Sequence, residues 1–299
     1  MMTNFQRTIR RTITCKGIGL HSGQKVSVSL KPAAAGTGIK FVRTDLGIDI
    51  PATLAHLGPT QVLQTTLVNG AASVDTVEHL LSALFGLGID NVIIELNQSE
   101  VPIMDGSAAP WVYLIQEAGV KEQAAARQVL RVLRAVTVER GEKSISIYPS
   151  DTFRISYAIQ FDHPMLRSQK KSLDVTEASF VDEIAPARTF GFLKEVEMLR
   201  QRGLALGGSL DNAVVLGETG VLNPLRFEDE FVRHKMLDVI GDLALVGHPI
   251  AGHVSVQRGG HALHAELAAE LMRQTDSWTL VDASVPAGQR VPVTGTVVA

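Results

Sequence analysis

The chain has 299 residues, of which 45% are hydrophobic and 20% charged, a balance typical of globular proteins with substantial cores. This length suits two medium-sized domains. The formal net charge of −3 argues against a general nucleic-acid-binding protein, which would carry an excess of basic residues, so we expect no nucleic-acid partner.

The sequence contains no apolar run long enough to cross a membrane, and residues 1–16 lack the apolar core of a signal peptide. The single cysteine, Cys15, excludes an internal disulfide and suits a reducing compartment. We therefore expect a cytoplasmic protein without stable membrane insertion. Nothing in the pattern indicates a coiled coil or a long exposed strand edge, which favours a monomer.

Strands and helices alternate in the first half of the chain. Short strands are predicted at 25–30 and 39–42, where apolar and polar residues alternate. A helix is predicted over 73–87, capped by Asp75 or Ser73 and stopped by glycine. The remaining elements predicted in this half are a buried strand at 91–96, a turn at 104–107 and a helix at 108–118.

The polar, Ala- and Gln-rich stretch 119–128 is predicted to separate two domains, 1–124 and 125–285. The second domain is interrupted by a Gly- and Leu-rich insertion at about 191–220, and the tail 286–299 is expected to be flexible. Each half has strands, a histidine-bearing helix, a glycine stop and an apolar strand, which indicates two similar domains. Elements predicted in the second half are strands within 129–161, a helix at 176–184, a long helix at 228–246 and a strand at 252–256.

The long predicted helix places His234, Asp238 and Asp242 on one face, because residues four apart are neighbours on a helix. An imidazole and a carboxylate offered by one rigid element can bind zinc. The alternative is an ion pair on a solvated face, which is usually weak. Two like charges at this spacing are unfavourable without a cation, and the flanking residues are largely apolar. We therefore favour a metal or a buried charge network.

The predicted helix of the first half carries Glu78 and His79. Catalytic zinc takes three nitrogen or oxygen ligands, so His79 can complete a set begun on the long helix. The adjacent Glu78 can then accept a proton from water. The alternative is that Glu78 closes a capping box with Asp75 and that His79 is a buried interface histidine. On this fragment alone the alternative is preferred.

Two further segments carry candidate catalytic groups. His261 follows two glycines in a predicted loop, from which it can act as a general acid; the alternative is an ordinary turn histidine. Thr189 precedes an aromatic pair and can polarise a carbonyl beside an apolar channel; the alternative is a strand edge with core phenylalanines. The Gly-rich run 17–23 is not a phosphate-binding loop, because it lacks the Gly-Lys-Ser/Thr ending. The histidines interpreted as structural are His56, His163, His248, His253 and His264.

These segments occur together, in this order, in one protein family. The chain resembles UDP-3-O-acyl-N-acetylglucosamine deacetylase, a zinc amidase of lipid A biosynthesis, over about residues 5–285. The segment 226–242 is the most specific match, and 76–79 is moderately specific. The other matching segments are 17–23, 88–91, 101–110, 187–192, 207–212 and 260–261.

The resemblance implies an α+β fold of two similar domains. Each domain would be a layered sandwich in which a sheet packs on helices, with the active site in the cleft between the domains. The resemblance also implies one zinc ion bound by His79, His234 and Asp238, with Glu78 as the general base.

The family also implies roles for residues outside the zinc ligands. His261 would protonate the leaving amine, with Asp242 beside it, and Thr189 would hydrogen-bond the carbonyl oxygen. The insertion at 191–220 would form the passage for the acyl chain. The substrate-binding candidates are Lys235 at the diphosphate, Phe161 on the uracil, and Phe190, Phe192 and His21.

The predicted function is therefore hydrolysis of the N-acetyl group of UDP-3-O-(3-hydroxyacyl)-N-acetylglucosamine, which gives the free amine and acetate. The partner is this small-molecule acylated UDP-amino sugar. Two alternatives stay open: a zinc hydrolase of another amide, and a non-catalytic sugar-nucleotide- or lipid-binding protein with a structural metal site. Glu78 and His261 argue against the second alternative, since a structural site needs neither.

Overall fold

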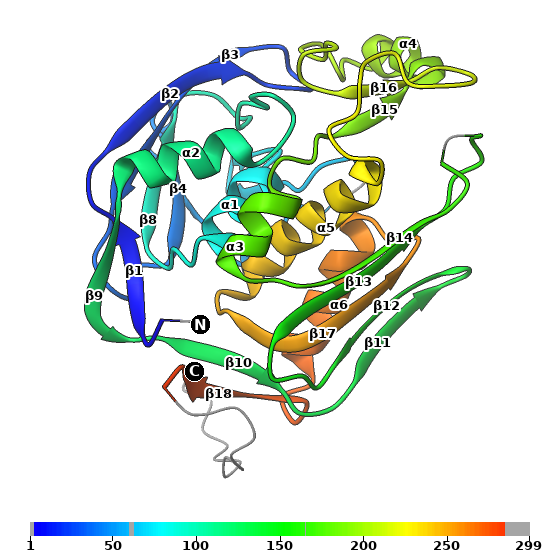
Figure 1. Cartoon of the computed structure of the whole chain (residues 1–299). Helices are drawn as coiled ribbons and strands as arrows, with labels where there is room; N and C mark the ends of the chain where they lie inside the picture. The colour runs from blue at the N-terminus through cyan, green and yellow to red at the C-terminus, as the bar shows by residue number, and fades with distance from the viewer. Residues whose placement is uncertain (1–2, 60–62, 165, 285–299) are drawn as a thin grey trace.

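The structure, a computed structural model, describes residues 3–59, 63–164 and 166–284. The tail predicted at 286–299 lies outside the described residues. The architecture is α+β, as predicted: each half of the chain builds a sheet that packs on helices, and helices lie between the two sheets (Figure 1).

The first half forms a sheet of five strands. Their bounds are β2 Ile13–Ile18, β3 Lys25–Pro32, β4 Ile39–Arg43, β5 Ile48–Pro51 and β8 Val92–Leu96. The strand order is β2-β3-β8-β4-β5, in which β8 is antiparallel to β3 and parallel to β4. Alternate residues of β3, namely Val26, Val28 and Leu30, are buried, because successive side chains of a strand point to opposite faces. The predicted strands at 25–30, 39–42 and 91–96 are confirmed.

Two helices pack beside this sheet. The second of them agrees with the prediction for 108–118, and Gly119 ends it with a φ of 72°. The bounds of these helices and of the short elements near them are α1 Glu78–Gly86, α2 Ala109–Ala118, the 3₁₀ turn Leu54–His56, β6 Leu67–Asn69 and β7 Ala72–Val74.

The start of α1 differs from the prediction, which places it at residue 73. The residues before α1 pair as β7 with β6, and Thr76 has a left-handed φ of 58°, which no helix accommodates. The residue before the helix is Val77, and α1 has no side-chain cap. The predicted caps at Asp75 and Ser73, and the alternative capping box, are therefore wrong.

The second half forms a larger sheet. Its bounds are β10 Gln128–Val132, β11 Val136–Arg140, β12 Lys143–Tyr148, β13 Phe153–Ile159, β14 Gln169–Asp174, β17 Ile250–Gln257 and β18 Trp278–Asp282. The order is β11-β12-β17-β10-β18, and β13 joins by pairing with β17 and β14. Strand β17 is antiparallel to β12 and parallel to β10 and β13. The predicted strands within 129–161 and at 252–256 are confirmed.

The stretch predicted as the domain boundary is a strand. β9 (Val120–Ala126) pairs antiparallel with β1 (Phe5–Ile9) and leads directly into β10. The chain therefore passes from the first half to the second in an extended form. The division between residues 124 and 125 falls within β9, and the two-domain partition stays a prediction.

Both helices predicted in the second half are confirmed. The helix at 176–184 is a short turn, α3 (Glu177–Ser179), which Thr176 caps and which continues as a π-helix over Phe180–Ile184. The long helix at 228–246 is α5 (Glu230–Leu243), which continues as a 3₁₀ turn over Ala244–Val246. Gly247 ends it with a left-handed φ of 82°.

Another helix, α6 (His261–Arg273), is not among the predicted elements. Leu263, Leu267 and Leu271 are buried and recur every four residues, which is a helical pattern. The two glycines before His261 indicated a loop instead, so His261 stands in the first turn of a helix. Within the described ranges, no helix is long and apolar enough to cross a membrane.

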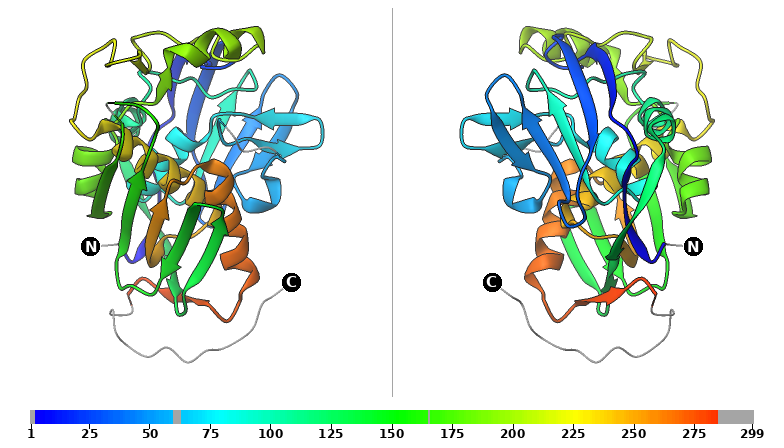
Figure 2. Two further views of the ribbon diagram at one scale, coloured as in Figure 1. Left: turned by 90° about the vertical axis from the view of Figure 1, so that its right-hand side faces the viewer. Right: turned by 90° about the vertical axis from the view of Figure 1, so that its left-hand side faces the viewer.

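The insertion predicted at about 191–220 contacts the first half of the chain. The backbone N–H groups of Leu206 and Gly207 donate to the carbonyl oxygens of His21 and Leu20, at 3.1 and 3.0 Å. Figure 2 shows this part of the chain beside the ends of β2 and β3. Its elements are a parallel pair, β15 Phe190–Phe192 and β16 Val214–Leu216, and α4 Leu193–Gln201.

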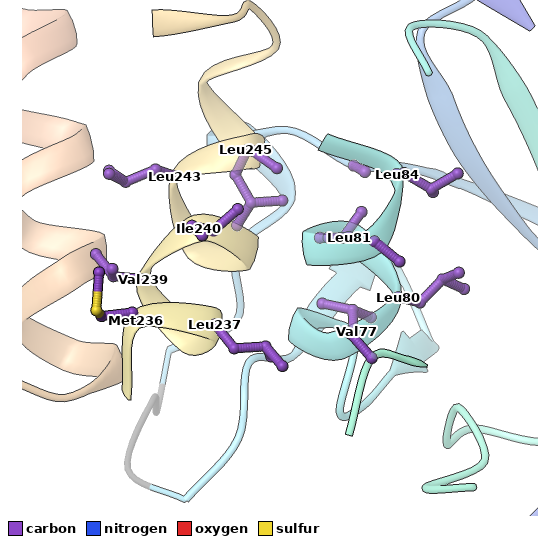
Figure 3. Packing of buried hydrophobic residues seen from close by; sticks show 14 of the residues in the cluster. Val77, Leu80, Leu81, Leu84, Met236, Leu237, Val239, Ile240, Leu243 and Leu245 are labelled. Carbon is purple, nitrogen blue, oxygen red and sulfur yellow. The ribbon is translucent and has the colours of Figure 1, made fainter. Parts of the chain in front are cut away.

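The helices α1 and α5 lie side by side, and apolar side chains of both helices are buried around the contact, with Leu237 of α5 directed toward α1 (Figure 3). Leu80, Leu81 and Leu84 of α1 and Leu237 and Ile240 of α5 have no exposed surface. Burial of such side chains is the main stabilising contribution at a helix interface. This interface joins a helix of the first half to a helix of the second.

The backbones of α1 and α5 come very close at Gly241. A Cβ atom at this position would lie 2.1 Å from the carbonyl oxygen of Glu78, so only glycine fits without displacement. The contact fixes the start of α1 against the second half of α5.

Replacing Gly241 by alanine should lower the free energy of unfolding by roughly 1–3 kcal/mol, because the added methyl group forces the two helices apart. Urea denaturation measures the change. Gly220→Ala is the matched control, since a Cβ there meets nothing within 4 Å, and its midpoint should stay near that of the wild type. Equal midpoints for both variants would contradict the close approach.

Candidate active site

Three buried side chains that can bind a metal converge where α1 meets α5. His79 lies in the first turn of α1, and His234 and Asp238 lie one turn apart on α5. Nε2 of His79 and Nε2 of His234 lie 3.9 and 3.3 Å from Oδ1 of Asp238. All three side chains are almost completely buried, so the alternative of an ion pair on a solvated face is wrong. The three are close enough to share one ion.

The hydrogen bonds around these side chains leave ligand atoms available. Nδ1 of His234 donates to the carbonyl oxygen of Ala187 at 3.1 Å, which leaves Nε2 with a free lone pair. Oδ2 of Asp238 accepts from Nζ of Lys235 at 2.7 Å, whereas Oδ1 has no hydrogen-bond partner among the described residues. A buried acceptor without a partner is costly, and a metal ion would satisfy it.

Burial favours the protonation states that metal binding needs. It lowers the pKa of His79 to about 3, helped by His234, and it lowers the pKa of His234 as well. Burial alone would raise the pKa of Asp238, but His234 and Lys235 hold it well below its usual value. Two neutral imidazoles and an ionised carboxylate are a suitable ligand set for a divalent metal, zinc included.

Glu78 lies directly beside this ligand set. Its Oε2 accepts from the backbone N–H of Thr65 at 3.0 Å, and its Oε1 lies 4.0 Å from Nε2 of His261. Burial raises the pKa of Glu78 to about 7, against the opposing effect of His261. A carboxyl group with this pKa can accept a proton from water near neutral pH.

A second buried cluster surrounds Asp242. Nδ1 of His261 and Nδ1 of His264 both donate to Oδ2 of Asp242 at 2.8 Å, and the hydroxyl of Thr65 donates to Oδ1 at 2.5 Å. Asp242, His261 and His264 are also close enough to hold a metal, but hydrogen-bond donors already occupy both oxygens of the carboxylate. The cluster is therefore better described as a hydrogen-bonded network than as a metal site.

The Asp242 network raises the pKa of His261, whereas the pKa values of His79, His234 and His264 are lowered. Burial alone would lower the pKa of His261, but Asp242 raises it to about 9. For Asp242 the directions are reversed: burial alone would raise its pKa, but the His261 cation and its hydrogen bond hold the pKa at about 2. His261 is thus a cation that faces Glu78, which suits a proton donor and a proton acceptor at one site.

Of the remaining polar candidates, Lys235 contacts a metal-ligand candidate directly, while Thr189 and His21 have contacts elsewhere. Two backbone hydrogen bonds of 2.8 Å fix Thr189. Its N–H donates to the carbonyl oxygen of Gly106, and its carbonyl oxygen accepts from the N–H of Val214. Nζ of Lys235 donates to Oδ2 of Asp238, one of the metal-ligand candidates. His21 lies between β2 and β3, where its Nδ1 accepts from the N–H of Ala205 at 3.4 Å, so it contacts the insertion.

The three aromatic candidates form one cluster. The ring centroid of Phe161 lies 5.8 Å from that of Phe190 and 5.7 Å from that of Phe192. Phe190 in turn lies 6.3 Å from the ring of His234, so the cluster reaches the metal-ligand candidates. Phe161 also borders a cavity of about 370 Å³, lined by Gln160, Phe161, Asp162, Arg167 and Arg258.

Sequence reasoning missed Thr65 and interpreted His264 as structural, although both contact Asp242. The hydroxyl of Tyr157 lies 3.0 Å from Nε2 of His264, so the two ring nitrogens of His264 contact Tyr157 and Asp242. His264 follows His261 by three residues, so recognising α6 would have exposed the pair on one helix face. Thr65 has no such spacing pattern, because it lies outside every helix.

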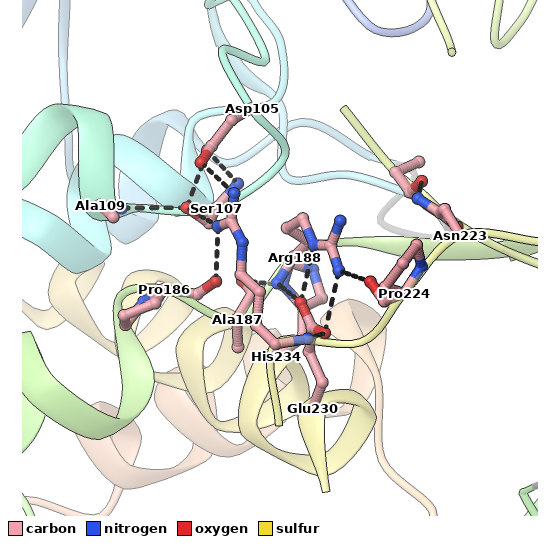
Figure 4. Close-up of polar contacts among 12 residues, drawn as sticks. Asp105, Ser107, Ala109, Pro186, Ala187, Arg188, Asn223, Pro224, Glu230 and His234 are labelled. Atoms are coloured by element: carbon pink, nitrogen blue, oxygen red, sulfur yellow. Dashed lines mark hydrogen bonds and ion pairs between the residues drawn. The ribbon is translucent and has the colours of Figure 1, made fainter. Parts of the chain in front are cut away.

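A buried ion pair holds the segment that carries Ala187 (Figure 4). The backbone N–H and Nε of Arg188 donate to Oε1 of Glu230 at 3.0 and 2.9 Å. Burial alone would raise the pKa of Glu230, but the hydrogen bonds of Arg188 lower it. Because Ala187 precedes Arg188 directly, the ion pair keeps its carbonyl oxygen facing His234.

The same network connects the two halves of the chain. The backbone N–H of Arg226 donates to Oε2 of Glu230 at 2.6 Å, and its guanidinium donates to Asp105 at 2.8 Å. Asp105 lies in the turn predicted at 104–107. The position of His234 thus depends on contacts from both halves.

Together, the α+β fold and this arrangement of imidazoles and carboxylates define a candidate metal-dependent hydrolase. Comparison with known proteins then gives the family. Residues 6–273 match the family model for UDP-3-O-acyl N-acetylglycosamine deacetylase, and the chain belongs to this family. A curated relative from Pseudomonas entomophila (strain L48), a UDP-3-O-acyl-N-acetylglucosamine deacetylase, is 54% identical over 282 residues, which are 92% of this chain and 93% of the relative. The resemblance inferred from the sequence and the enzyme class, an amide hydrolase, are confirmed.

Replacing Arg188 by methionine should lower the free energy of unfolding by about 3–5 kcal/mol, because it leaves the buried carboxylate of Glu230 unpaired. The ion pair depresses the pKa of Glu230, so its stabilisation is present at neutral pH and is lost as the pH falls through that pKa. The difference between variant and wild type, measured by urea denaturation, should therefore shrink in acid.

The matched control is Arg154→Met, which removes a half-exposed partner of Asp174 at 3.4 Å. Exposed ion pairs contribute little, so this variant should unfold near the wild-type midpoint. An Arg188→Met variant as stable as this control would show that the buried pair does not hold the segment.

Proposed function

We propose that this protein is a zinc-dependent deacetylase that hydrolyses the N-acetyl group of UDP-3-O-(3-hydroxyacyl)-N-acetylglucosamine in lipid A biosynthesis. The products are the free amine and acetate. The observation that carries the proposal is the meeting of the metal-ligand candidates with Glu78 and His261 in one buried cluster, in a chain of this family. We further propose that the enzyme acts as a monomer in the cytoplasm.

His79, His234 and Asp238 are the proposed zinc ligands. The free lone pair on His234 and the unpartnered oxygen of Asp238 support this assignment. When bound, zinc supplies Lewis-acid activation of water and of the amide carbonyl. Lys235 and the carbonyl oxygen of Ala187 orient two of the ligands, as outer hydrogen-bond partners commonly do.

Glu78 and His261 divide the proton transfers of the hydrolysis. Glu78 takes a proton from the attacking water, whose oxygen bonds to the carbonyl carbon. His261, kept cationic by Asp242, gives a proton to the amide nitrogen as the C–N bond breaks, because an amine leaves poorly unless it is protonated. The 4.0 Å between Oε1 of Glu78 and Nε2 of His261 supports this division, since both groups can reach one reacting centre.

The remaining candidates are assigned to the substrate. The hydroxyl of Thr189 donates a hydrogen bond to the carbonyl oxygen of the acetamide and stabilises the negative charge that develops there. Phe161 stacks on the uracil, and the diphosphate meets Lys235. The cavity beside Phe161 supports this placement because Arg167 and Arg258 line it, and cationic side chains suit a diphosphate.

The insertion is proposed as the passage for the acyl chain, with Phe190, Phe192 and His21 at its walls. Several of its long aliphatic side chains are exposed, and their gathering on one segment supports an apolar ligand there. These exposed residues are Leu193, Met198, Leu206 and Leu210.

The purified protein should release acetate from the acylated sugar nucleotide and should contain one zinc ion. A chelator should abolish turnover and lower the melting temperature, and added Zn²⁺ should restore both, because the buried carboxylate loses its cation. Glu78→Gln should reduce kcat by roughly 100-fold or more while keeping the metal. Activity that a chelator leaves intact would contradict the zinc mechanism, and equal turnover of unrelated acetamides would favour a different amide substrate.

The dependence of kcat/KM on pH should be bell-shaped. Activity should fall as the pH drops through the pKa of Glu78, about 7, because the base becomes protonated. It should also fall as the pH rises through the pKa of His261, about 9, because the acid loses its proton. Asp242→Asn removes the charge that raises this second pKa, so the alkaline limb should move to lower pH. An unmoved alkaline limb would exclude His261 as its source.

A further inference from the structure

Thr65, which precedes β6, uses all three of its polar groups inside the site. Its backbone N–H donates to Oε2 of Glu78 at 3.0 Å, and its hydroxyl donates to Oδ1 of Asp242 at 2.5 Å. Its carbonyl oxygen accepts from the backbone N–H of Val77 at 3.3 Å. The residue is 2% exposed, so water does not compete for these bonds.

The two carboxyl groups that Thr65 contacts have different tasks in the proposed mechanism. Glu78 accepts a proton, and Asp242 keeps His261 cationic. Glu78 belongs to α1 and Asp242 to α5, so one residue outside both helices bridges them. The branched Cβ of threonine restricts the rotation of its hydroxyl, which makes the bridge stiff.

The hydroxyl of Thr65 determines how Asp242 can orient. Oδ2 of Asp242 accepts from His261 and His264 at 2.8 Å, while Thr65 donates to the other oxygen. With donors on both oxygens, the carboxylate cannot turn without breaking a bond. Oγ1 of Thr65 also lies 3.3 Å from Nδ1 of His261. Loss of the hydroxyl would therefore free the carboxylate to turn and the imidazole to follow it.

We propose that Thr65 is a positioning residue for the deacetylation. It holds the base Glu78 at a fixed distance from the pair of His261 and Asp242. The proton acceptor and the proton donor can then act on the same amide of the substrate. The inference rests on the proposed function, because it assigns a task within that reaction. Thr65 therefore acts on kcat rather than on KM.

The test compares the steady-state kinetics of the zinc-loaded wild type, Thr65→Val and Thr65→Ser. Valine keeps the shape and the backbone N–H but lacks the hydroxyl, whereas serine keeps both polar groups. For Thr65→Val, kcat should fall roughly 10- to 100-fold and KM should stay within about twofold. Thr65→Ser should recover kcat to within about threefold of the wild type.

Thr66→Val is the matched control, because it makes the same change at the next residue, whose hydroxyl donates to Asp75 at 2.8 Å. Its kcat should stay close to that of the wild type. A second comparison introduces Thr65→Val into an Asp242→Asn background. If Thr65 acts through Asp242, the loss there should be much smaller than in the wild type, since coupled residues are not additive.

Wild-type kcat in Thr65→Val, equal losses in the valine and serine variants, or full additivity with Asp242→Asn would each overturn the inference. If circular dichroism shows that Thr65→Val does not fold, Thr65→Ala takes its place, since it also lacks the hydroxyl. Failure of the proposed function is distinguishable, because the wild type would then release no acetate. Failure of the inference alone leaves an active wild type and an unimpaired valine variant.

Discussion

The close contact between α1 and α5 is the constraint on which the rest of the structure depends. Gly241 lets α5 approach the backbone of Glu78, and the approach brings His79 against His234 and Asp238. The contact is enclosed by apolar side chains, so the ionisable groups that it carries are removed from water. Burying a charge is costly unless it is paired or hydrogen-bonded. The site meets this condition by collecting donors and acceptors from α1, α5, α6 and the segment before β6.

The same burial acts in opposite directions on neighbouring groups. It raises the pKa of Glu78 and lowers the pKa of His79, so the carboxyl group becomes a better base while the imidazole stays neutral. Asp242 reverses the effect at His261, whose pKa rises to about 9. One water-poor environment therefore suits the neutral ligand, the base and the cationic acid that we propose. The difference between the two imidazoles comes chiefly from the carboxylate of Asp242, helped by Asp238 and Glu78, rather than from their depth.

Sequence patterns predicted those features that depend on local geometry. The strand at 25–30 and the face shared by His234 and Asp238 could be predicted, because helix and strand periods fix which residues are neighbours. The α+β class followed from the family resemblance instead. The start of α1, the strand β9 and the position of Thr65 could not, because each depends on a partner far away in the chain. β7 pairs with β6, β9 pairs with β1, and Thr65 meets Asp242. The helix α6 was predictable in principle from its leucine spacing, but the glycines before His261 obscured it.

The contact between the insertion and the loop joining β2 to β3 bears on how the molecule can move. The two halves are joined by the α1–α5 interface, by the extended passage from β9 to β10, and by the hydrogen bonds of Leu206 and Gly207 to the first half. Hinge motion turns on a few flexible residues at one axis. Here, rotation about any one junction would have to break the others, which also include the hydrogen bond from Arg226 to Asp105. The proposed reacting groups are thus held together by the fold itself, and we expect turnover to be limited by passage of ligands rather than by closure of two lobes.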